Sequence, residues 1–270
     1  LLSDTFDIRR ADYLWKKKEC PPEVPACWPA RLNRRCRREP LAYILGGTEF
    51  MGLPFRTGPG VLIPRQDTET LAEWVLEDDG RKASAAADNE GPGGGRNEAD
   101  AGRQLLDICT GTGCIGLSLA RLGGYRATLA DISEEALRVA RENGKALGVE
   151  ARIYAGDLFD ALPAGERYDV IVSNPPYIES AVIETLQEEV RLYEPRLALD
   201  GRADGLYFYR RLLREAPSRM KPGGRMYVEI GCDQGAAVSR LFEEAGFLEV
   251  SVRRDLAGND RVVRGAYPDV

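Results

Sequence analysis

The sequence predicts an α/β protein with a mostly parallel sheet, and three observations lead to that fold class. From residue 104 onward, short apolar runs with strand character alternate with amphipathic stretches of helical period. Most of these strands are separated by connections long enough to hold a helix, as parallel strands require. A glycine-rich turn at 109–113 and an Asn-Pro-Pro-Tyr turn at 174–177 each follow a strand, at the carboxyl end where such sheets hold ligands.

The composition is that of a globular protein without a membrane segment or a metal centre. The chain has 270 residues, 43% hydrophobic and 30% charged, enough for one large domain with an appendage. It has no apolar run of the ~18 residues that a membrane-spanning helix needs and no signal-peptide pattern. Six cysteines without a C-x-x-C pair, and no histidine, argue against a zinc site, a disulfide framework and a Ser-His-Asp arrangement. We therefore expect a cytoplasmic protein that binds no metal and no membrane.

Positive charge is concentrated near the N-terminus. Residues 1–40 carry a net charge of +4, from ten Lys/Arg and six Asp/Glu, against −10 for the rest of the chain. An arginine cluster in this stretch is either a solvated helix face or a surface for RNA or an acidic protein. Its members are Arg31, Arg34, Arg35, Arg37 and Arg38. The acidic body of the chain disfavours a stable nucleic-acid partner.

The first 76 residues are predicted to precede the main sheet as two small units. Residues 1–38 have a polar helical pattern interrupted by four prolines, which indicates a partial helical segment. Residues 39–76 form a linking unit. Within it, Gly and Pro turns between short strands at 41–64 favour a hairpin, and a helix follows that Asp67 or Thr68 can cap.

A change of composition marks the start of the main domain. Residues 77–103 contain six glycines and almost no large apolar side chain, so we expect a flexible insertion that the fold can dispense with. Residues 104–270 form the main domain. Its strands are predicted at 104–110, 126–132, 151–157, 168–174, 224–231, 248–255 and 261–266. Its helices are predicted at 114–122, 134–147, 205–220 and 234–245. The last two strands lack an intervening helix and should form an antiparallel edge hairpin.

The turn after the first strand of this domain has the glycine spacing of a nucleotide-binding loop. Gly111, Gly113 and Gly116 fit G-x-G-x-x-G between a strand and a helix, where glycines let a ligand approach the backbone. Asp131 follows Gly111 by twenty residues and ends the next strand, where a carboxylate can accept both hydroxyls of a ribose. The alternative for Asp131 is a capping role at the following helix.

Two further acids favour S-adenosylmethionine over a nicotinamide or flavin dinucleotide. Asp107 lies inside the strand end, where it either orders the loop or draws the amino group of a methionine moiety. Asp157 and Leu158 end the third strand, where an adenine would lie. The full set expected to contact the cofactor is Asp107, Cys109, Thr110, Gly111, Thr112, Gly113, Asp131, Ile132, Asp157, Leu158 and Asn174.

The fourth strand ends in Asn-Pro-Pro-Tyr because proline cannot continue a ladder inside a sheet, and the two rings fix the backbone that follows. With this turn, the chain resembles the peptide-chain release factor glutamine N5-methyltransferase family from about Glu39 to its end. The resemblance also rests on E-P-L-A-Y-I at 39–44, L-I-P-R-Q-D-T-E at 62–69 and E-P-R-L-A-L at 194–199. The turn alone is shared with enzymes that methylate adenine amino groups in DNA or RNA.

The resemblance implies both a fold and a reaction. The fold is a seven-stranded, mostly parallel Rossmann-like methyltransferase sheet with an antiparallel edge hairpin, preceded by a short helical segment and a β-hairpin. S-adenosylmethionine would be the methyl donor and S-adenosylhomocysteine the product. The acceptor would be the glutamine of a Gly-Gly-Gln motif in a class I release factor.

The resemblance also implies a substrate site around the turn. A glutamine amide carries two N–H donors, which the Asn174 side-chain oxygen and the Pro175 carbonyl would accept, while Tyr177 supplies a face for the planar amide. Because the sulfonium supplies the leaving group, positioning is the main task and no histidine base is needed. The residues expected to complete the substrate pocket are Pro176, Phe50 and Arg65. The 178–204 connection is expected to act as a lid.

The chain departs from the family pattern in four places. The N-terminal helical part has about half the usual length, and the insertion at 77–103 is longer than usual. Gln66 stands where proline is common, and Cys109 where glycine is usual. Two rival functions remain. One is an adenine-N6 methyltransferase, for which only residues 1–40 offer a basic surface. The other is a non-catalytic S-adenosylmethionine-binding protein, against which Asn174 and Asp131 argue.

Overall fold

The computed structural model describes residues 1–6, 24–80 and 102–269. Its centre is a seven-stranded sheet with the strand order β5-β4-β3-β6-β7-β9-β8. The strands are β3 Gln104–Ile108, β4 Arg126–Asp131, β5 Arg152–Ala155, β6 Tyr168–Ser173, β7 Met220–Glu229, β8 Leu248–Arg254 and β9 Asp260–Ala266. The five strands β3 to β7 run parallel, and β9 is antiparallel to both β7 and β8. The predicted seven-stranded α/β fold is therefore confirmed.

The chain order in the sheet reverses beside β3. From β3 the chain adds β4 and β5 on one side, then returns to place β6 and β7 on the other. This reversal opens a crevice at the carboxyl ends of β3 and β6, the position where open α/β sheets bind ligands. The final hairpin places β9 inside the sheet and β8 at its edge.

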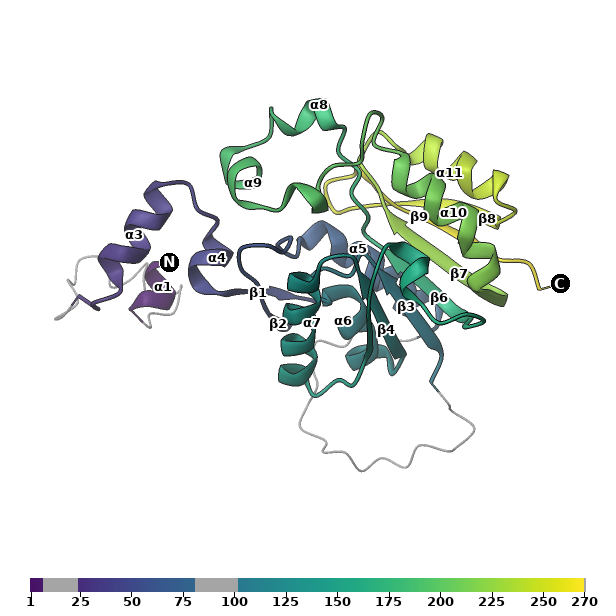
Figure 1. The fold of residues 1–270 in the computed structure, drawn as a ribbon, viewed down its shortest axis with the longest axis horizontal. Helices are drawn as coiled ribbons and strands as arrows, with labels where there is room; N and C mark the ends of the chain where they lie inside the picture. The colour runs from purple at the N-terminus through teal and green to yellow at the C-terminus, as the bar shows by residue number, and fades with distance from the viewer. Residues whose placement is uncertain (7–23, 81–101, 270) are drawn as a thin grey trace.

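Helices cover both faces of the sheet (Figure 1). Neighbouring strand residues point to opposite faces and so join two separate cores. Leu105 and Val170 pack with the layer of α5, α6 and α7, whereas Leu106 and Ile171 pack with α10 and α11. The bounds of these helices are α5 Gln66–Asp78, α6 Cys114–Gly123, α7 Glu134–Leu147, α10 Tyr207–Arg219 and α11 Gly235–Glu244. None of the helices in the described part is long and apolar enough to cross a membrane.

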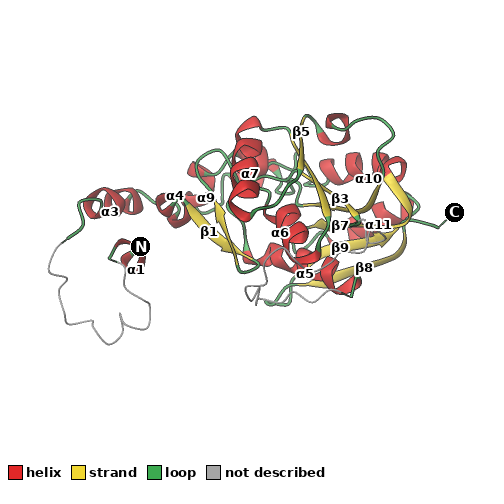
Figure 2. Ribbon diagram, turned by 90° about the horizontal axis from the view of Figure 1, so that it is seen from below, coloured by secondary structure: helices red, strands yellow, loops and turns green. Residues whose placement is uncertain are grey.

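The N-terminal units lie at one end of the molecule (Figure 2). They consist of α1 Leu2–Thr5, α3 Trp28–Cys36, α4 Leu41–Leu45 and the antiparallel pair β1 Gly47–Phe50 and β2 Leu53–Arg56. The expected hairpin is present. The expectation of strand structure was wrong for residues 41–45, which form the short helix α4 with Pro40 as its N-cap and Gly46 as its C-cap, at a left-handed φ of 82°.

Two further predictions concern the start of α5 and the segment that follows this helix. The predicted capping of α5 by Asp67 or Thr68 was wrong, because the helix already begins at Gln66 and Arg65 is its N-cap. Most of the predicted flexible insertion, 77–103, lies outside the described residues. Within its described part, residues 77 and 78 still belong to α5, and the domain bounds remain a prediction.

The 178–204 connection contains short helices and contacts the N-terminal part. Its elements are α8 Ser180–Ile183, α9 Glu188–Tyr193 and a 3-10 turn, η2 Arg196–Ala198. Arg35 of α3 pairs with Glu189 of α9 at 2.6 Å, and the Tyr193 hydroxyl donates to the Arg37 carbonyl. Within the arginine cluster, four side chains pair with carboxylates of the described residues: Arg31, Arg34, Arg35 and Arg38. These arginines are therefore partly neutralised within the chain, which favours the interpretation of a solvated helix face.

Candidate active site

A cavity of about 250 Å³ lies at the carboxyl ends of β3, β4 and β6, where the strand order reverses. Most of the predicted cofactor and substrate residues line it: Arg65, Cys109, Thr110, Gly111, Thr112, Asp131, Ile132, Asp157, Leu158, Asn174 and Pro176. The other predicted residues do not line it: Phe50, Asp107, Gly113, Pro175 and Tyr177. The two turns noted in the sequence thus meet at one cavity.

The loop after β3 is fixed by a buried carboxylate. Oδ2 of Asp107 accepts hydrogen bonds from the Thr110 hydroxyl at 2.6 Å and the Gly116 N–H at 2.9 Å. A Cβ at Gly116 would lie 2.4 Å from Cδ2 of Leu129 and 3.0 Å from Cβ of Asp107, so a larger residue here would displace the side chains that pack between helix and strand. Burial raises the pKa of Asp107 to about 7. Its second oxygen, Oδ1, has no hydrogen-bond partner among the described residues.

The same loop contains a residue in an unusual backbone conformation. Cys109 has a φ of 60°, in the left-handed region that favours glycine. That conformation gives a physical reason why glycine suits this position. Gly111 and Gly113 are also left-handed, with φ of 56° and 80°, which turns the backbone sharply from β3 into α6.

Asp131 connects this loop to the end of β4. Its Oδ2 accepts from the Gly111 N–H and its Oδ1 from the Ser133 N–H, both at 2.9 Å. Burial raises the pKa of Asp131, and these backbone donors oppose the shift. The N-cap of α7 is Ser133, whose hydroxyl accepts from the Ala136 N–H, so Asp131 is not the helix cap. Its carboxylate lines the cavity and can accept further hydrogen bonds there.

The side of the cavity beyond Asp131 combines apolar side chains with a charged pair. Ile132 is 54% exposed although it is large and hydrophobic, and it lines the cavity with Leu158. The Asp157 carboxylate is held by Arg211 of α10 at 2.8 and 3.0 Å. Phe208, beside this arginine, also faces the cavity. Such a mixture of apolar faces and a paired carboxylate suits a planar heterocycle with polar edges.

Asn174 lies where β6 ends, and its side chain reaches α5. Its Nδ2 donates to the Thr68 hydroxyl at 3.4 Å, and both residues line the cavity. Tyr177, three residues on, faces away from the cavity instead of lining it. Its hydroxyl donates to Oε1 of Glu229 at 3.1 Å, and its carbonyl accepts from Gln234 at 3.1 Å. Tyr177 thus anchors the turn from behind.

The opposite wall is the segment 61–65, which is held from two sides. The Tyr43 hydroxyl donates to the Val61 carbonyl. From the 178–204 connection, the buried Glu194 accepts from the Ile63 N–H at 3.1 Å and pairs with Arg65. The E-P-L-A-Y and E-P-R motifs therefore converge on one segment of the cavity wall.

Phe50 lies in the hydrophobic core and not at the cavity. It is 0% exposed and packs edge-to-face on Phe55, 6.1 Å between ring centroids, in the core beneath β1 and β2. The position of Phe50 supports a core role instead of a place in the cavity wall. Its strand has a side-chain alternation that sends this aromatic inward.

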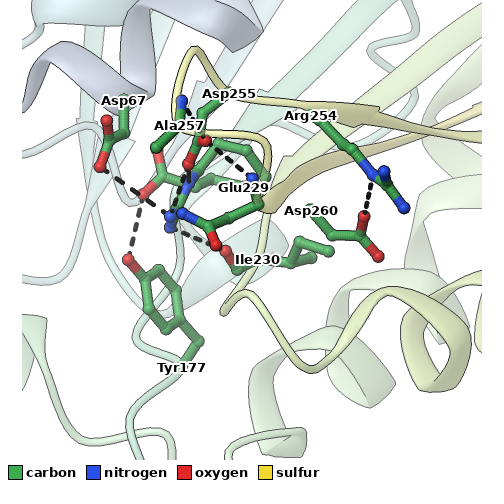
Figure 3. A network of polar contacts seen from close by, with 10 residues as sticks. Asp67, Tyr177, Glu229, Ile230, Arg254, Asp255, Ala257 and Asp260 are labelled. Atoms are coloured by element: carbon green, nitrogen blue, oxygen red, sulfur yellow. Dashed lines mark hydrogen bonds and ion pairs between the residues drawn. The ribbon is translucent and has the colours of Figure 1, made fainter.

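Two residues that line the cavity, Thr68 and Arg211, and the buried Glu229 that bonds to Tyr177 (Figure 3) were not predicted as site residues from the sequence. Thr68 was considered only as a helix cap, and Glu229 and Arg211 were not considered at all. Glu229 ends the strand next to β6, and an acid at the end of a central strand is a usable signal. Arg211 and Thr68 lie on helix faces whose direction the sequence does not show. Among the described residues, no cluster of His, Cys, Asp or Glu could hold a metal ion.

Two family models match most of the chain between them. The model described as "Methyltransferase small domain" matches residues 96–250, and the "PrmC N-terminal domain" model matches residues 1–46. The chain is 42% identical over 267 residues to the release factor glutamine methyltransferase of Geobacter sulfurreducens, covering 98% of this chain and 87% of the relative. It is 43% identical over 246 residues to the enzyme of the same name from Bordetella pertussis, covering 90% and 84%.

Solved structures agree on the fold. A methyltransferase from Pyrococcus furiosus superposes with a TM-score of 0.55 at 17% identity, covering 89% of this chain and 98% of that one. The Thermus thermophilus 16S rRNA N2 G1207 methyltransferase, solved with AdoMet and guanosine, superposes with a TM-score of 0.55 at 19% identity, covering 82% and 49%. At this level of identity, the likeness concerns the fold alone.

Proposed function

The chain belongs to the release factor glutamine methyltransferase family, and we propose that it transfers a methyl group from S-adenosylmethionine to the side-chain amide nitrogen of a glutamine in a class I peptide-chain release factor. The acceptor is the glutamine of a Gly-Gly-Gln motif. The observation that carries the assignment of the reacting centre is the orientation of Asn174. Its Nδ2 points to Thr68, which leaves Oδ1 as an acceptor at the cavity.

An amide nitrogen is a poor nucleophile because its lone pair is delocalised into the carbonyl, so the chain must hold it in place. Oδ1 of Asn174 accepts one of its two N–H donors, and the carbonyl of Pro175, between the cavity-lining Asn174 and Pro176, is the proposed acceptor of the other. This fixes the nitrogen in line with the methyl group and favours rehybridisation during transfer. On transfer the glutamine nitrogen would form the N–CH₃ bond as the C–S bond of the sulfonium breaks, and the nitrogen would then release one proton to solvent. The neutral thioether is the leaving group, so no general base is required.

The residues along β3 and β4 fit the methyl donor. When bound, S-adenosylmethionine supplies an electrophilic methyl group on a positively charged sulfur. Asp131 would accept the ribose hydroxyls, and the apolar side chains of Ile132 and Leu158 would contact the adenine. The unpartnered Oδ1 of Asp107 is a buried acceptor next to the left-handed loop at 109–113, which suits the amino group of the methionine moiety. The acids also balance the positive charge of the donor.

An adenine amino group presents the same NH₂ on an sp² carbon, so Asn174 alone does not choose between the acceptors. Within the described residues, four of the five arginines of the 31–38 cluster pair with carboxylates of the chain, which leaves this cluster little free positive charge for a nucleic acid. Glutamine of a protein is therefore the favoured acceptor.

Transfer from labelled S-adenosylmethionine tests the proposal. We expect label in a release factor carrying Gly-Gly-Gln and none in the Gly-Gly-Asn version, a DNA duplex or a free RNA. The shorter asparagine side chain would leave its amide about one methylene short of the methyl group. Equal labelling of the two release factors, or preferential labelling of a nucleic acid, would contradict the proposal.

A further inference from the structure

An arginine and a carboxylate pair on the donor side of the cavity. Asp157 follows β5, and Arg211 lies on α10. One nitrogen of the guanidinium, Nη1, donates to both carboxylate oxygens of Asp157, at 3.0 Å to Oδ1 and at 2.8 Å to Oδ2. Both side chains line the cavity. Neither of them takes part in the methyl transfer itself, so the pair calls for another role at the site.

The pair lies where the base of the methyl donor is expected. In the sheet, Ala155 of β5 is the strand neighbour of Asp131, the proposed acceptor of the ribose hydroxyls. Asp157 comes two residues after Ala155, at the carboxyl end of the adjacent strand. The apolar residues assigned to the adenine, Ile132 and Leu158, directly follow these two acids in the chain and line the cavity. A base held between them would present its edge to the Asp157 carboxylate.

Arg211 is held from several sides. Its side chain is 19% exposed, and its Cζ lies 5.8 Å from the centroid of the Tyr207 ring. That ring packs edge-on against Phe208, with 5.1 Å between the ring centroids. Further along α10, Arg219 donates to the Pro163 carbonyl at 2.7 Å, which ties the helix to the segment after β5 a second time. The guanidinium of Arg211 is therefore in a fixed position relative to that segment.

Asp157 depends on this arginine for its orientation. Its side chain is 44% exposed, and among the described residues Arg211 is the one donor to its carboxylate. An ionised carboxylate has about four lone-pair sites, so acceptor sites remain for a ligand in the cavity. Because water screens the charges of an exposed pair, Arg211 acts on the direction of this carboxylate more than on its charge.

We propose that Arg211 is a positioning residue that holds Asp157 as a hydrogen-bond acceptor for the amino group of the adenine, and that it thereby sets the preference of the donor site for an amino purine. The inference rests on the proposed function, in which S-adenosylmethionine occupies this side of the cavity. A hypoxanthine base carries a carbonyl oxygen in place of the amino group, and two acceptors cannot hydrogen-bond. Without Arg211 the carboxylate can turn towards water, and the distinction between the two bases weakens.

Two product analogues that differ at this group test the inference. The affinities of S-adenosylhomocysteine and S-inosylhomocysteine are measured by titration calorimetry. For the wild type, we expect the inosyl compound to bind at least about tenfold more weakly, the loss that one hydrogen bond to a charged group accounts for. In Arg211→Met, which keeps an apolar stem and loses the guanidinium, this difference should fall to about threefold or less. A general loss of folded protein would weaken both compounds alike and leave their ratio unchanged.

Two further variants separate positioning from a structural role. Arg210→Met is a matched control on the same helix, because Arg210 also pairs with a carboxylate, that of Asp204 at 2.6 Å, but does not line the cavity. It should keep the wild-type ratio. Asp157→Asn can present either an oxygen or an NH₂ and should bind the two compounds alike. In that background, Arg211→Met should not change the ratio further.

The outcomes distinguish the inference from the proposed function. A wild-type ratio in Arg211→Met, an equal fall in Arg210→Met, or equal binding of the two compounds by the wild type would overturn the inference. Methylation of the Gly-Gly-Gln release factor by the same wild-type protein would still leave the proposed function in place. A wild type that binds neither compound and transfers no methyl group would refute the proposed function and the inference with it.

Discussion

The two halves of the cavity are built in different ways. The half assigned to the methyl donor is mostly local: Asp107 bonds to Gly116, 9 positions on, and Gly111 to Asp131, 20 positions on. Its one long-range bond described above joins Asp157 to Arg211, 54 positions apart. The half assigned to the substrate joins distant segments. Thr68 and Asn174 are 106 positions apart, and Arg65 and Glu194 are 129 apart. A short motif can therefore specify the donor half, whereas the substrate half exists only in the completed fold.

The difference predicts that the two halves can be damaged separately. The largest effect is expected for Asn174→Ala. Single-turnover methyl transfer should fall by about 10²-fold or more, as for the loss of one placed polar group at a reacting centre. The affinity for S-adenosylmethionine should stay within about twofold by titration calorimetry, since Asn174 acts on the acceptor. A large loss of donor affinity in this variant would show that Asn174 also contributes to binding of the methyl donor and that the two halves are not separate.

Asp131→Ala should damage the donor half, which is measured as a loss of affinity for S-adenosylmethionine. Loss of a charged hydrogen-bond acceptor should cost about 1.5–3 kcal/mol of binding, which is roughly a 10- to 150-fold rise in the dissociation constant of S-adenosylmethionine. Calorimetry with the donor and with NAD checks both the site and the cofactor class. Equal donor affinity in the variant and the wild type, or tighter binding of NAD, would refute this assignment.

The wall at 61–65 offers a smaller effect on the substrate half. Glu194→Ala removes the acceptor of the Ile63 N–H and the partner of Arg65, so the wall should lose its fixed position. We expect about a tenfold loss of kcat/KM for the release factor, with the donor affinity unchanged. Glu188→Ala, at an exposed site on α9, is the control and should keep wild-type kinetics. Equal effects of the two substitutions would show that Glu194 has no specific role in the substrate half.

The smallest effect concerns the pH dependence of stability in the donor half. Burial raises the pKa of Asp107 from 3.8 to about 7, so the folded protein binds this proton more tightly than the unfolded chain does. The resulting stability is fully present below pH 3.8 and is lost as the pH rises through about 7. Asp107→Asn lacks this titration. Its free energy of unfolding relative to the wild type should therefore rise between pH 5 and pH 8, by on the order of 2 kcal/mol.

Denaturant unfolding of the two unliganded proteins at both pH values measures this difference. Other titrating groups are shared and cancel in the comparison. A constant difference across the range, or one that shrinks towards pH 8, would show that Asp107 is not a buried acid with a raised pKa.

The same contrast explains what the sequence could predict. Strand and helix positions in the main domain follow from periodicity, and the loop at 109–113 with Asp131 follows from spacing within one βαβ unit. Thr68 carries no local signal of its partner, because only the packing of α5 brings it within hydrogen-bond distance of Asn174. Phe50 and Tyr177 were expected to face the substrate, but strand alternation and the bond to Glu229 turn them away from the cavity.

The dependence of the single-turnover rate on S-adenosylmethionine concentration tests the separation of the two halves most directly. It is measured for the wild type, Asp131→Ala and Asn174→Ala with one release factor. Asp131→Ala should reach the wild-type plateau at a donor concentration at least about tenfold higher. Asn174→Ala should keep the wild-type midpoint and reach a plateau about 10²-fold lower. A shifted midpoint in Asn174→Ala, or a plateau equally depressed in Asp131→Ala, would contradict the division of the cavity into a donor half and a substrate half.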